Sequence, residues 1–292
     1  MRHAFSVKMA GALTLYALTL IAAAGQGFML RDPAFVGFEA RPLHADYIPF
    51  YANNIAAWWH ADLDVMAGTS GYTVTTWLDD SWGQRNHVGT AWDMTVNVSG
   101  HGPTWVANVL NGKPAVYFAA SQWLANLAPM WSGSQPRTIV ALYTAGGVMG
   151  VDPIFGQCGG STVGSWFMMQ SRDVGATGDP YFCGYANDVS GSTGQSGFWR
   201  QATIVFDGSI LRTYANGSIY GGPYDKSSLN TGNGGAANEM FMGADWDAGS
   251  SATAPGETAT QLYIFEIIVF NEALSDANRE EVESYLVDKY GL

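Results

Sequence analysis

The stretch QLYIFEIIVFNEALSDANREEVESYLVDKYGL, residues 261–292, decides the fold. From Leu262 to Phe270 every residue except Glu266 is apolar, and most are β-branched or aromatic, so both faces of the predicted strand must be covered by protein. A strand of this kind belongs in the middle of a sandwich. We interpret Glu266, the single acid in the run, as a structural carboxylate rather than as a general acid.

The residues that follow this strand predict a helix. Ser275 is a favourable N-cap, Asp276 lies in the first turn where the helix dipole favours a negative charge, and Gly291 is a favourable helix end. We expect one face of this helix to dock on the edge of the sheet, through residues at i, i+3 and i+4 spacing: Val282, Tyr285 and Leu286.

Short apolar runs separated by Gly, Asn and Asp make up the sequence from Ala56 to the closing strand. No helix-length amphipathic segment appears before Leu274. Strands at this spacing predict an all-β sandwich of two antiparallel sheets. The runs are IAAWWHADL, YTVTTWLDD, TWVAN, PAVYFA, TIVALYTA, SWFMMQS, ATIVFDG, ILRTYANG and EMFMGAD.

Four blocks carry a resemblance to a known family. They are VTTWLDDSWGQRNHV (74–88), NGKPAVYF (111–118), ATIVFDGSILRTYANGSI (202–219) and EIIVFNEALSDANREEVESYLVDKYGL (266–292). In this order they resemble the laminin-G-like, concanavalin-A-like lectin-glucanase jelly-roll domains of bacteria and phages, over about residues 52 to 292. The resemblance implies a jelly roll for residues 51–292. It leaves function open, because this fold hosts lectins, glycan hydrolases and interaction modules.

The composition favours a neutral, aromatic-rich surface. Charged residues make up 13 % of the chain where about 25 % is usual, and there are 11 Trp and 14 Tyr. Such a surface suits glycans or neighbouring subunits. With 13 basic residues and a net charge of -12, the chain lacks the basic clusters that phosphate backbones require. Nucleic acid is therefore excluded as a partner.

Residues 1–24 have the plan of a secretory signal peptide. Arg2, His3 and Lys8 precede an apolar run over 9–24 that ends in small residues. Two interpretations are open: the segment is cleaved from a secreted protein, or it is retained and buried against partner subunits or a membrane. The run is shorter than the roughly 20 residues of a comfortable membrane span.

Residues 25–50 predict an extended arm rather than a flexible linker. The segment has three prolines, no helical or strand period, and large aromatic residues that a linker would lack. Such an arm either packs on a neighbouring subunit or covers an edge of its own domain. We therefore divide the chain into an apolar segment and arm, 1–50, and a jelly-roll domain, 51–292.

Candidate carbohydrate-binding residues are loop tryptophans that lie near polar side chains. A pyranose needs an exposed aromatic ring for its apolar face and polar groups for its hydroxyls. The residues that meet this description are Trp82, Trp92, Trp246, Asn86 and Asp93. Tryptophans within strands are predicted to be core residues: Trp58, Trp77, Trp105 and Trp166.

Calcium is the cofactor that the family resemblance implies, at a loop rim with Asp and Asn oxygens. The candidate ligands are Asp79, Asp80, Asp245 and Asp247. The alternative is that these residues shape turns through local hydrogen bonds. Cys158 and Cys183 leave two alternatives as well: a disulfide if their segments pair in one sheet, or two buried free thiols.

Three functions compete. The first is a non-catalytic structural or adhesion protein on the exterior of a large assembly, with a bacteriophage virion as the leading case, where residues 1–50 contact other subunits and the lectin-like domain binds cell-surface glycans. The second is a secreted or cell-surface bacterial carbohydrate-binding module. A glycan hydrolase is third, because no pair of carboxylates alternates along one strand. We therefore predict that the protein is not an enzyme.

Overall fold

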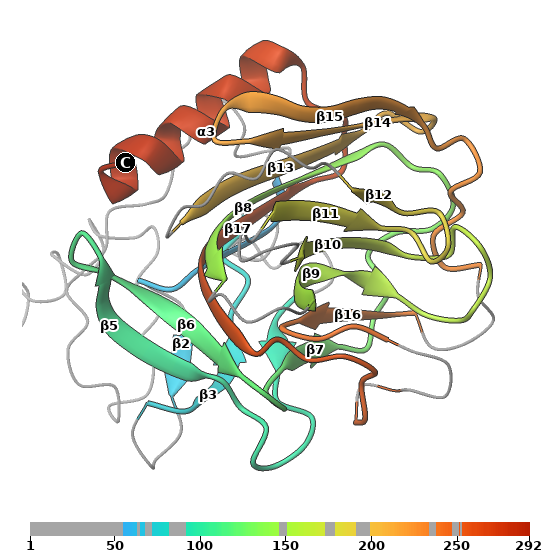
Figure 1. Cartoon of the computed structure of the whole chain (residues 1–292). Helices are drawn as coiled ribbons and strands as arrows, with labels where there is room; N and C mark the ends of the chain where they lie inside the picture. The colour runs from blue at the N-terminus through green and yellow to red at the C-terminus, as the bar shows by residue number, and fades with distance from the viewer. Residues whose placement is uncertain are drawn as a thin grey trace, which may run out of the picture. The chain divides into compact units, whose positions relative to one another are not determined.

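The computed structural model describes residues 55–62, 65–67, 72–81, 92–145, 151–172, 179–190, 199–233, 238–246, 251 and 253–292. These residues form two antiparallel sheets that pack face to face, with the helix α3 (Asp276–Tyr290) on the outer side of one sheet (Figure 1). The predicted all-β sandwich with a closing helix is confirmed. The predicted arm, residues 1–50, lies outside the described residues.

The first sheet is organised around the predicted central strand, β17 (Gln261–Phe270). Its strand order is β15-β14-β13-β8-β17-β6-β5, and β1 also pairs with β17. Three neighbours therefore pair with the backbone of β17, which places it in the interior of the sheet, as predicted. The other strands are β1 (Ile55–His60), β5 (Thr104–Leu110), β6 (Lys113–Ala119), β8 (Arg137–Ala145), β13 (Arg200–Phe206), β14 (Ile210–Ala215) and β15 (Ser218–Asp225).

The second sheet has the order β12-β11-β10-β9-β16-β7-β4-β3-β2. Its longest strands, β9 and β10, are neighbours near the middle. Its strands are β2 (Val65–Ala67), β3 (Val74–Trp77), β4 (Met94–Thr95), β7 (Leu124–Asn126), β9 (Val151–Cys158), β10 (Phe167–Arg172), β11 (Asp179–Cys183), β12 (Val189–Ser190) and β16 (Glu239–Met242).

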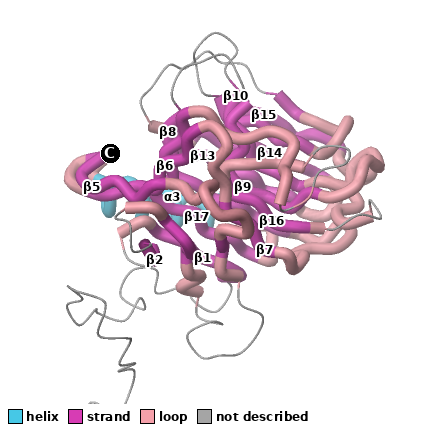
Figure 2. Tube along the Cα trace, turned by 90° about the horizontal axis from the view of Figure 1, so that it is seen from below, coloured by secondary structure: helices cyan, strands magenta, loops and turns pink. Residues whose placement is uncertain are grey.

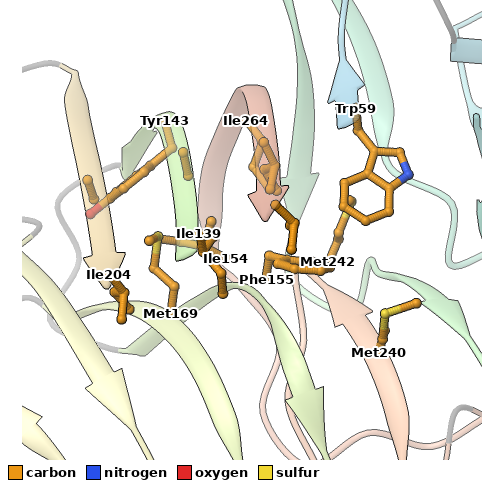
Figure 3. Packing of buried hydrophobic residues seen from close by; sticks show 14 of the residues in the cluster. Trp59, Ile139, Tyr143, Ile154, Phe155, Met169, Ile204, Met240, Met242 and Ile264 are labelled. Atoms are coloured by element: carbon orange, nitrogen blue, oxygen red, sulfur yellow. The ribbon is translucent and has the colours of Figure 1, made fainter. Parts of the chain in front are cut away.

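The main core fills the space between the two sheets. Trp59 and Ile264 of the first sheet pack in one cluster with Phe155 and Met242 of the second, and all four are fully buried (Figure 3). Burying a large apolar side chain contributes roughly 1.5 to 3 kcal/mol. The alternation of side chains along each strand places these residues inward, so the core follows from the sequence pattern.

Helix α3 begins and ends where its capping residues predict. The Ser275 hydroxyl accepts a hydrogen bond from the Asn278 N–H, and Gly291 closes the helix in the left-handed region at φ 65°. The expected docking position is corrected: α3 covers the outer face of the first sheet, not its edge, because the outward side chains of the central strands β8 and β17 are themselves apolar. The contacts include Val282, Leu286, Val140, Leu142, Phe265 and Ile268.

Strands account for most of the described chain, as the magenta tube in Figure 2 makes clear. Among the described helical residues, none belong to a helix with the length and hydropathy that crossing a membrane requires.

Candidate functional site

Asp79 and Asp93, two of the predicted site residues, hold a turn beside β1. The Asp79 carboxylate accepts hydrogen bonds from the backbone N–H groups of Trp58 and Ser81, both at 2.9 Å. The Asp93 carboxylate in turn accepts from the Asp79 N–H at 2.8 Å. Burial raises the pKa of Asp79 to about 6, and the neighbouring Asp93 charge acts in the same direction. Asp79 and Asp93 therefore shape this turn through local hydrogen bonds.

Asp80 and Trp92 lie close by in the chain but have different partners. Asp80 Oδ2 is 3.1 Å from His60 Nε2. Trp92 is half-buried against the main core, and its carbonyl accepts a hydrogen bond from Trp59 Nε1 at 3.1 Å. The ring of Trp92 is therefore engaged in packing.

The remaining predicted residues that the structure describes follow β16. The Asp245 carboxylate accepts hydrogen bonds from Gln170 Nε2 at 3.0 Å and from the Glu257 N–H at 2.9 Å. Trp246 is buried on the outer face of the second sheet. The structure thus separates Asp245 and Trp246 from the Asp79 region. Three predicted residues, Trp82, Asn86 and Asp247, lie outside the described residues.

The predicted calcium ligands that the structure describes have partners within the protein. Ca²⁺ takes six to eight oxygen ligands, so several carboxylates must converge. Nowhere in the described ranges do three His, Cys, Asp or Glu side chains gather as a metal site requires. Asp79 points at backbone N–H groups, while Asp80 points at His60. Calcium at these four residues stays a prediction, because Asp247 lies outside the described residues.

Cys158 and Cys183 are free, buried thiols. They lie on β9 and β11, and β10 runs between these strands. Strands on either side of a third are roughly 9 to 10 Å apart, whereas a disulfide needs Cα atoms within about 7 Å. Burial raises the pKa of Cys183 to about 12 and that of Cys158 well above its usual range. Of the two alternatives, the structure has the pair of free thiols.

Glu266 is fully buried beneath α3 and has four donors. Its Oε1 accepts from Trp58 Nε1 at 2.6 Å and from the Tyr285 hydroxyl at 3.0 Å. Its Oε2 accepts from Lys289 Nζ at 2.7 Å and from the Tyr290 hydroxyl at 2.9 Å. Every lone pair of the carboxylate is used, which agrees with a structural role.

A chain of hydrogen-bonded side chains extends from Glu266 to the end of β1. Asp62 Oδ1 accepts from Lys289 Nζ and lies near His60 Nδ1, both at 3.1 Å, and His60 Nε2 faces Asp80. Burial alone would raise the pKa of Asp62, but His60 and Lys289 outweigh it and hold that pKa well below its usual range. Glu266 and Asp62 likewise overcome burial and raise the pKa of Lys289. This Glu266 network fastens α3 to β1 and β17.

The outer face of the second sheet carries a separate cluster of aromatic side chains. Along β10, Phe167 and Met169 point to the main core, while Met168 joins the outer cluster. Trp166 lies edge-on to Trp246, with ring centroids 6.2 Å apart at 90°. We call this cluster the aromatic face; its members include Trp123, Trp166, Met168, Tyr181, Phe241 and Trp246.

A tight turn after β11 brings Tyr185 onto the aromatic face. The half-buried Tyr185 ring lies 5.0 Å from that of Trp166. Both Tyr185 and Ala186 have left-handed backbones, with φ of 51° and 53°. Such conformations cost about 1 to 3 kcal/mol each for residues other than glycine, and strain of this kind clusters at ligand sites. We call residues 184–188 the rim turn.

Lys226 and a neighbouring loop hold the rim turn in this conformation. Lys226 Nζ donates to the backbone and side-chain oxygens of Asn187, both at 2.9 Å, and to the Asp188 carbonyl at 3.1 Å. The Gly164 N–H donates to the Tyr185 carbonyl at 3.1 Å. The position of Tyr185 is therefore fixed from two sides, which is the preorganisation that a binding site needs.

Charged and polar groups link the rim turn to β10 and β11. The Arg172 guanidinium stacks on the Tyr181 ring at 3.7 Å, and the Tyr181 hydroxyl is hydrogen-bonded to the Asp188 carboxylate. Burial and then Asp188 raise the pKa of Tyr181, so the phenol stays protonated. Asp188 is exposed and Arg172 is half-buried. The rim turn thus carries a ring and an exposed carboxylate, and Tyr181 links that carboxylate to the Arg172 guanidinium.

The structure describes three of the predicted carbohydrate-binding residues, Trp92, Asp93 and Trp246. Of these three, only Trp246 lies on the aromatic face. Trp166 was predicted to be a core residue, and it is buried, but it belongs to the outer cluster rather than to the main core. The alternation of Trp166, Met168, Gln170 and Arg172 is the sequence signal for this face. Tyr185 carried no such signal, because it lies in a Gly-Tyr-Ala-Asn turn.

The fold defines a two-sheet β-sandwich protein. No protein-family model and no curated protein matches its sequence. Similar solved structures include a mutant of HCR/D (9 % identity, TM-score 0.48, covering 81 % of this chain and 52 % of that one). A Trypanosoma rangeli sialidase complex is 10 % identical with a TM-score of 0.47, and the match covers 97 % of this chain and 39 % of the sialidase. The receptor-binding domain of botulinum neurotoxin D is 10 % identical with a TM-score of 0.45, and the match covers 81 % of this chain and 54 % of that domain. The chain spans about half of these proteins or less, and the likeness concerns the fold alone.

Proposed function

We propose that this protein is a non-catalytic glycan-binding β-sandwich that holds a neutral sugar at the rim turn. The observation that carries the proposal is the strained placement of the half-buried Tyr185 ring against Trp166, in the same turn as the exposed Asp188. A flat ring next to hydrogen-bonding groups is what a pyranose requires, because one sugar face is apolar and its edge carries hydroxyls.

Each group at the rim turn has a chemical role in this proposal. Tyr185 stacks on the apolar face of the sugar. The exposed Asp188 carboxylate accepts hydrogen bonds from neighbouring hydroxyls. The net charge of -12 disfavours sialic acids, uronic acids and sulfated glycans, so neutral glycans are the proposed ligands.

The absence of catalysis is part of the proposal. Most glycoside hydrolases use one carboxylic acid and one carboxylate that flank the scissile bond. On this face, Asp245 accepts two protein hydrogen bonds, and Asp188 is bonded to Tyr181. A carboxylate that already accepts hydrogen bonds from the protein suits binding of a sugar hydroxyl better than transfer of a proton to the glycosidic oxygen.

The biological setting rests on the sequence of residues 1–50. We propose a protein on the exterior of a large assembly, with a bacteriophage virion as the leading case, because the arm combines aromatic residues with few charges. A secreted or surface-anchored bacterial module is the alternative, and it follows from the signal-like residues 1–24.

Calorimetry and a glycan array with the full chain test the binding site. Tyr185→Ala should weaken binding of a neutral glycan at least tenfold, about 1.4 kcal/mol. Tyr72→Ala is the matched control, because Tyr72 is 65 % exposed and stacks on Trp105 in another part of the fold. Equal binding by the Tyr185→Ala variant and the native chain would overturn the proposed site. Cleavage of a glycan that Asp188→Asn abolishes would instead establish an enzyme.

A further inference from the structure

The turn between β5 and β6 contacts the end of α3. It consists of Asn111 and Gly112, whose φ angles of 47° and 82° are left-handed, as a two-residue hairpin turn requires. The Asn111 side-chain amide donates two hydrogen bonds, to the Tyr290 carbonyl at 2.8 Å and to the Gly291 carbonyl at 2.9 Å. We call these two hydrogen bonds the Asn111 contact. It ties the hairpin to a helix end that lies 179 positions further along the chain.

The Asn111 contact depends on a hydrogen-bond donor. The carbonyls at the end of a helix have no partner within the helix, and the helix dipole gives this end a partial negative charge. An amide NH₂ group satisfies two such carbonyls. A carboxylate has only acceptor oxygens, so at position 111 it would repel the Tyr290 and Gly291 carbonyls. Replacing the amide nitrogen by oxygen is therefore enough to break the contact.

Asn111 and Gly112 form the dipeptide in which deamidation is fastest, because glycine has no side chain to hinder the reaction. The Gly112 backbone nitrogen bonds to Cγ of Asn111, the Cγ–Nδ2 bond breaks, and the amide nitrogen leaves as ammonia with the Gly112 amide proton. Water then opens the succinimide ring to give aspartate or isoaspartate. Both residues are exposed, and a methyl group added to Gly112 would meet no atom within 4 Å, so water reaches the turn.

The end of α3 that Asn111 holds also carries two donors of the Glu266 network. Lys289 Nζ and the Tyr290 hydroxyl donate to Glu266 Oε2 at 2.7 and 2.9 Å, and Tyr290 is 1 % exposed. The positions of both side chains depend on the last helical turn. A change at position 111 therefore acts on the buried network through the backbone of α3.

We propose that Asn111 is a deamidation site whose conversion to aspartate or isoaspartate releases the last turn of α3. The reaction needs only water, so the change is slow, runs in one direction and accumulates with the age of the molecule. It loosens the attachment of α3 to the first sheet and leaves the rim turn, which follows a strand of the second sheet, unaltered. The release of α3 is therefore independent of the proposed glycan binding.

A second Asn-Gly pair provides a comparison within the same chain. Asn216 and Gly217 form the two-residue turn between β14 and β15, are exposed, and have φ angles of 48° and 79°. The Asn216 side chain uses its oxygen, which accepts a hydrogen bond from the Gln201 N–H at 3.0 Å. An aspartate keeps that oxygen. Deamidation at position 216 thus preserves its hydrogen bond, whereas deamidation at position 111 removes both of its own.

Hydrogen exchange of the full chain, followed by mass spectrometry, tests the release. Asn111→Asp should make the last turn of α3, residues 287–290, exchange roughly tenfold faster or more, because repulsion replaces two hydrogen bonds. Asp-Gly also favours this type of turn, so the hairpin itself is kept. Asn111→Gly removes the contact without adding a charge and should have a smaller effect. Asn216→Asp is the matched control and should leave the last turn of α3 unchanged.

Two results of this experiment contradict the release. The first is native exchange over residues 287–290 in both Asn111 variants. The second is faster exchange that spreads evenly over both sheets instead of centring on α3.

Ageing of the native full chain in heavy-oxygen water at mildly alkaline pH tests the modification itself. The water that opens the succinimide leaves its oxygen at residue 111, so a peptide with this residue should gain heavy oxygen in step with faster exchange at the end of α3. A chain unfolded in denaturant is the positive control for the chemistry. Labelling at position 111 in the unfolded chain but not in the native chain would overturn the proposal, as would labelling of the native chain without faster exchange.

Discussion

Replacing Glu266 by Gln tests whether the Glu266 network stabilises the fold. Gln keeps the size of Glu but has one acceptor oxygen and an amide NH₂ in place of the second. With the oxygen towards Trp58 and Tyr285, the NH₂ group faces Lys289, which is itself a donor. Lys289 then keeps Asp62 as its only charged partner among the described residues.

The magnitude follows from the burial of the pair. Breaking a buried ion pair by removing one partner costs about 3 to 5 kcal/mol. Because Lys289 keeps Asp62, we expect the lower end, about 3 kcal/mol. For a domain of this size, 1 kcal/mol corresponds to about 2 to 4 °C, so the melting temperature should fall by roughly 6 to 12 °C.

Thermal unfolding followed by circular dichroism at pH 7 measures the effect. Glu281→Gln is the matched control, because Glu281 is exposed on the same helix, and its replacement should change stability by less than about 0.5 kcal/mol. A melting temperature for Glu266→Gln within 1 or 2 °C of the native value would refute the reasoning. Glycan binding by the folded variant should be unchanged, because Glu266 lies in the first sheet.

Three further predictions concern other buried or strained groups. Ala186→Gly should stabilise the protein by about 0.5 to 1 kcal/mol in chemical denaturation, because glycine adopts a φ near 53° without the cost that alanine incurs; a loss of stability would show that the turn is unstrained. Cys158 and Cys183 should resist iodoacetamide at pH 8 in the folded protein and react after unfolding, since burial raises both pKa values; rapid labelling of the native chain would contradict their burial. Burial raises the pKa of Asp79 to about 6, so Asp79 binds its proton more tightly in the folded state than in the unfolded state. Protonation of Asp79 therefore adds up to about 3 kcal/mol to the free energy of unfolding below about pH 4, and this stabilisation is lost as the pH rises through about 6. Asp79→Asn should therefore flatten the change in stability between pH 4 and 7, and an identical pH profile for both proteins would argue against this shift.

Much of the candidate site could not be predicted, because its members come from distant segments. Trp246 was predicted to bind sugar on the strength of its acidic neighbours, yet it meets Trp166, 80 positions earlier in the chain, across the second sheet. The Asp79 and Asp80 carboxylates were adjacent in sequence and seemed suited to one ion. They point to different partners because successive residues of extended chain project in opposite directions.

The sequence by itself determined the elements whose causes are local. The apolar run from Leu262 to Phe270 requires cover on both faces, and Ser275 and Gly291 set the ends of α3, so the central strand and the closing helix follow from neighbouring residues alone. The order of strands in a sheet depends on segments that meet only in the folded chain. Lys289 and Asp62 are 227 residues apart, and nothing in either segment specifies the other. Alternation along a strand shows which side chains share a face. Strand order and register decide which residues that face contacts, and only the tertiary structure supplied them.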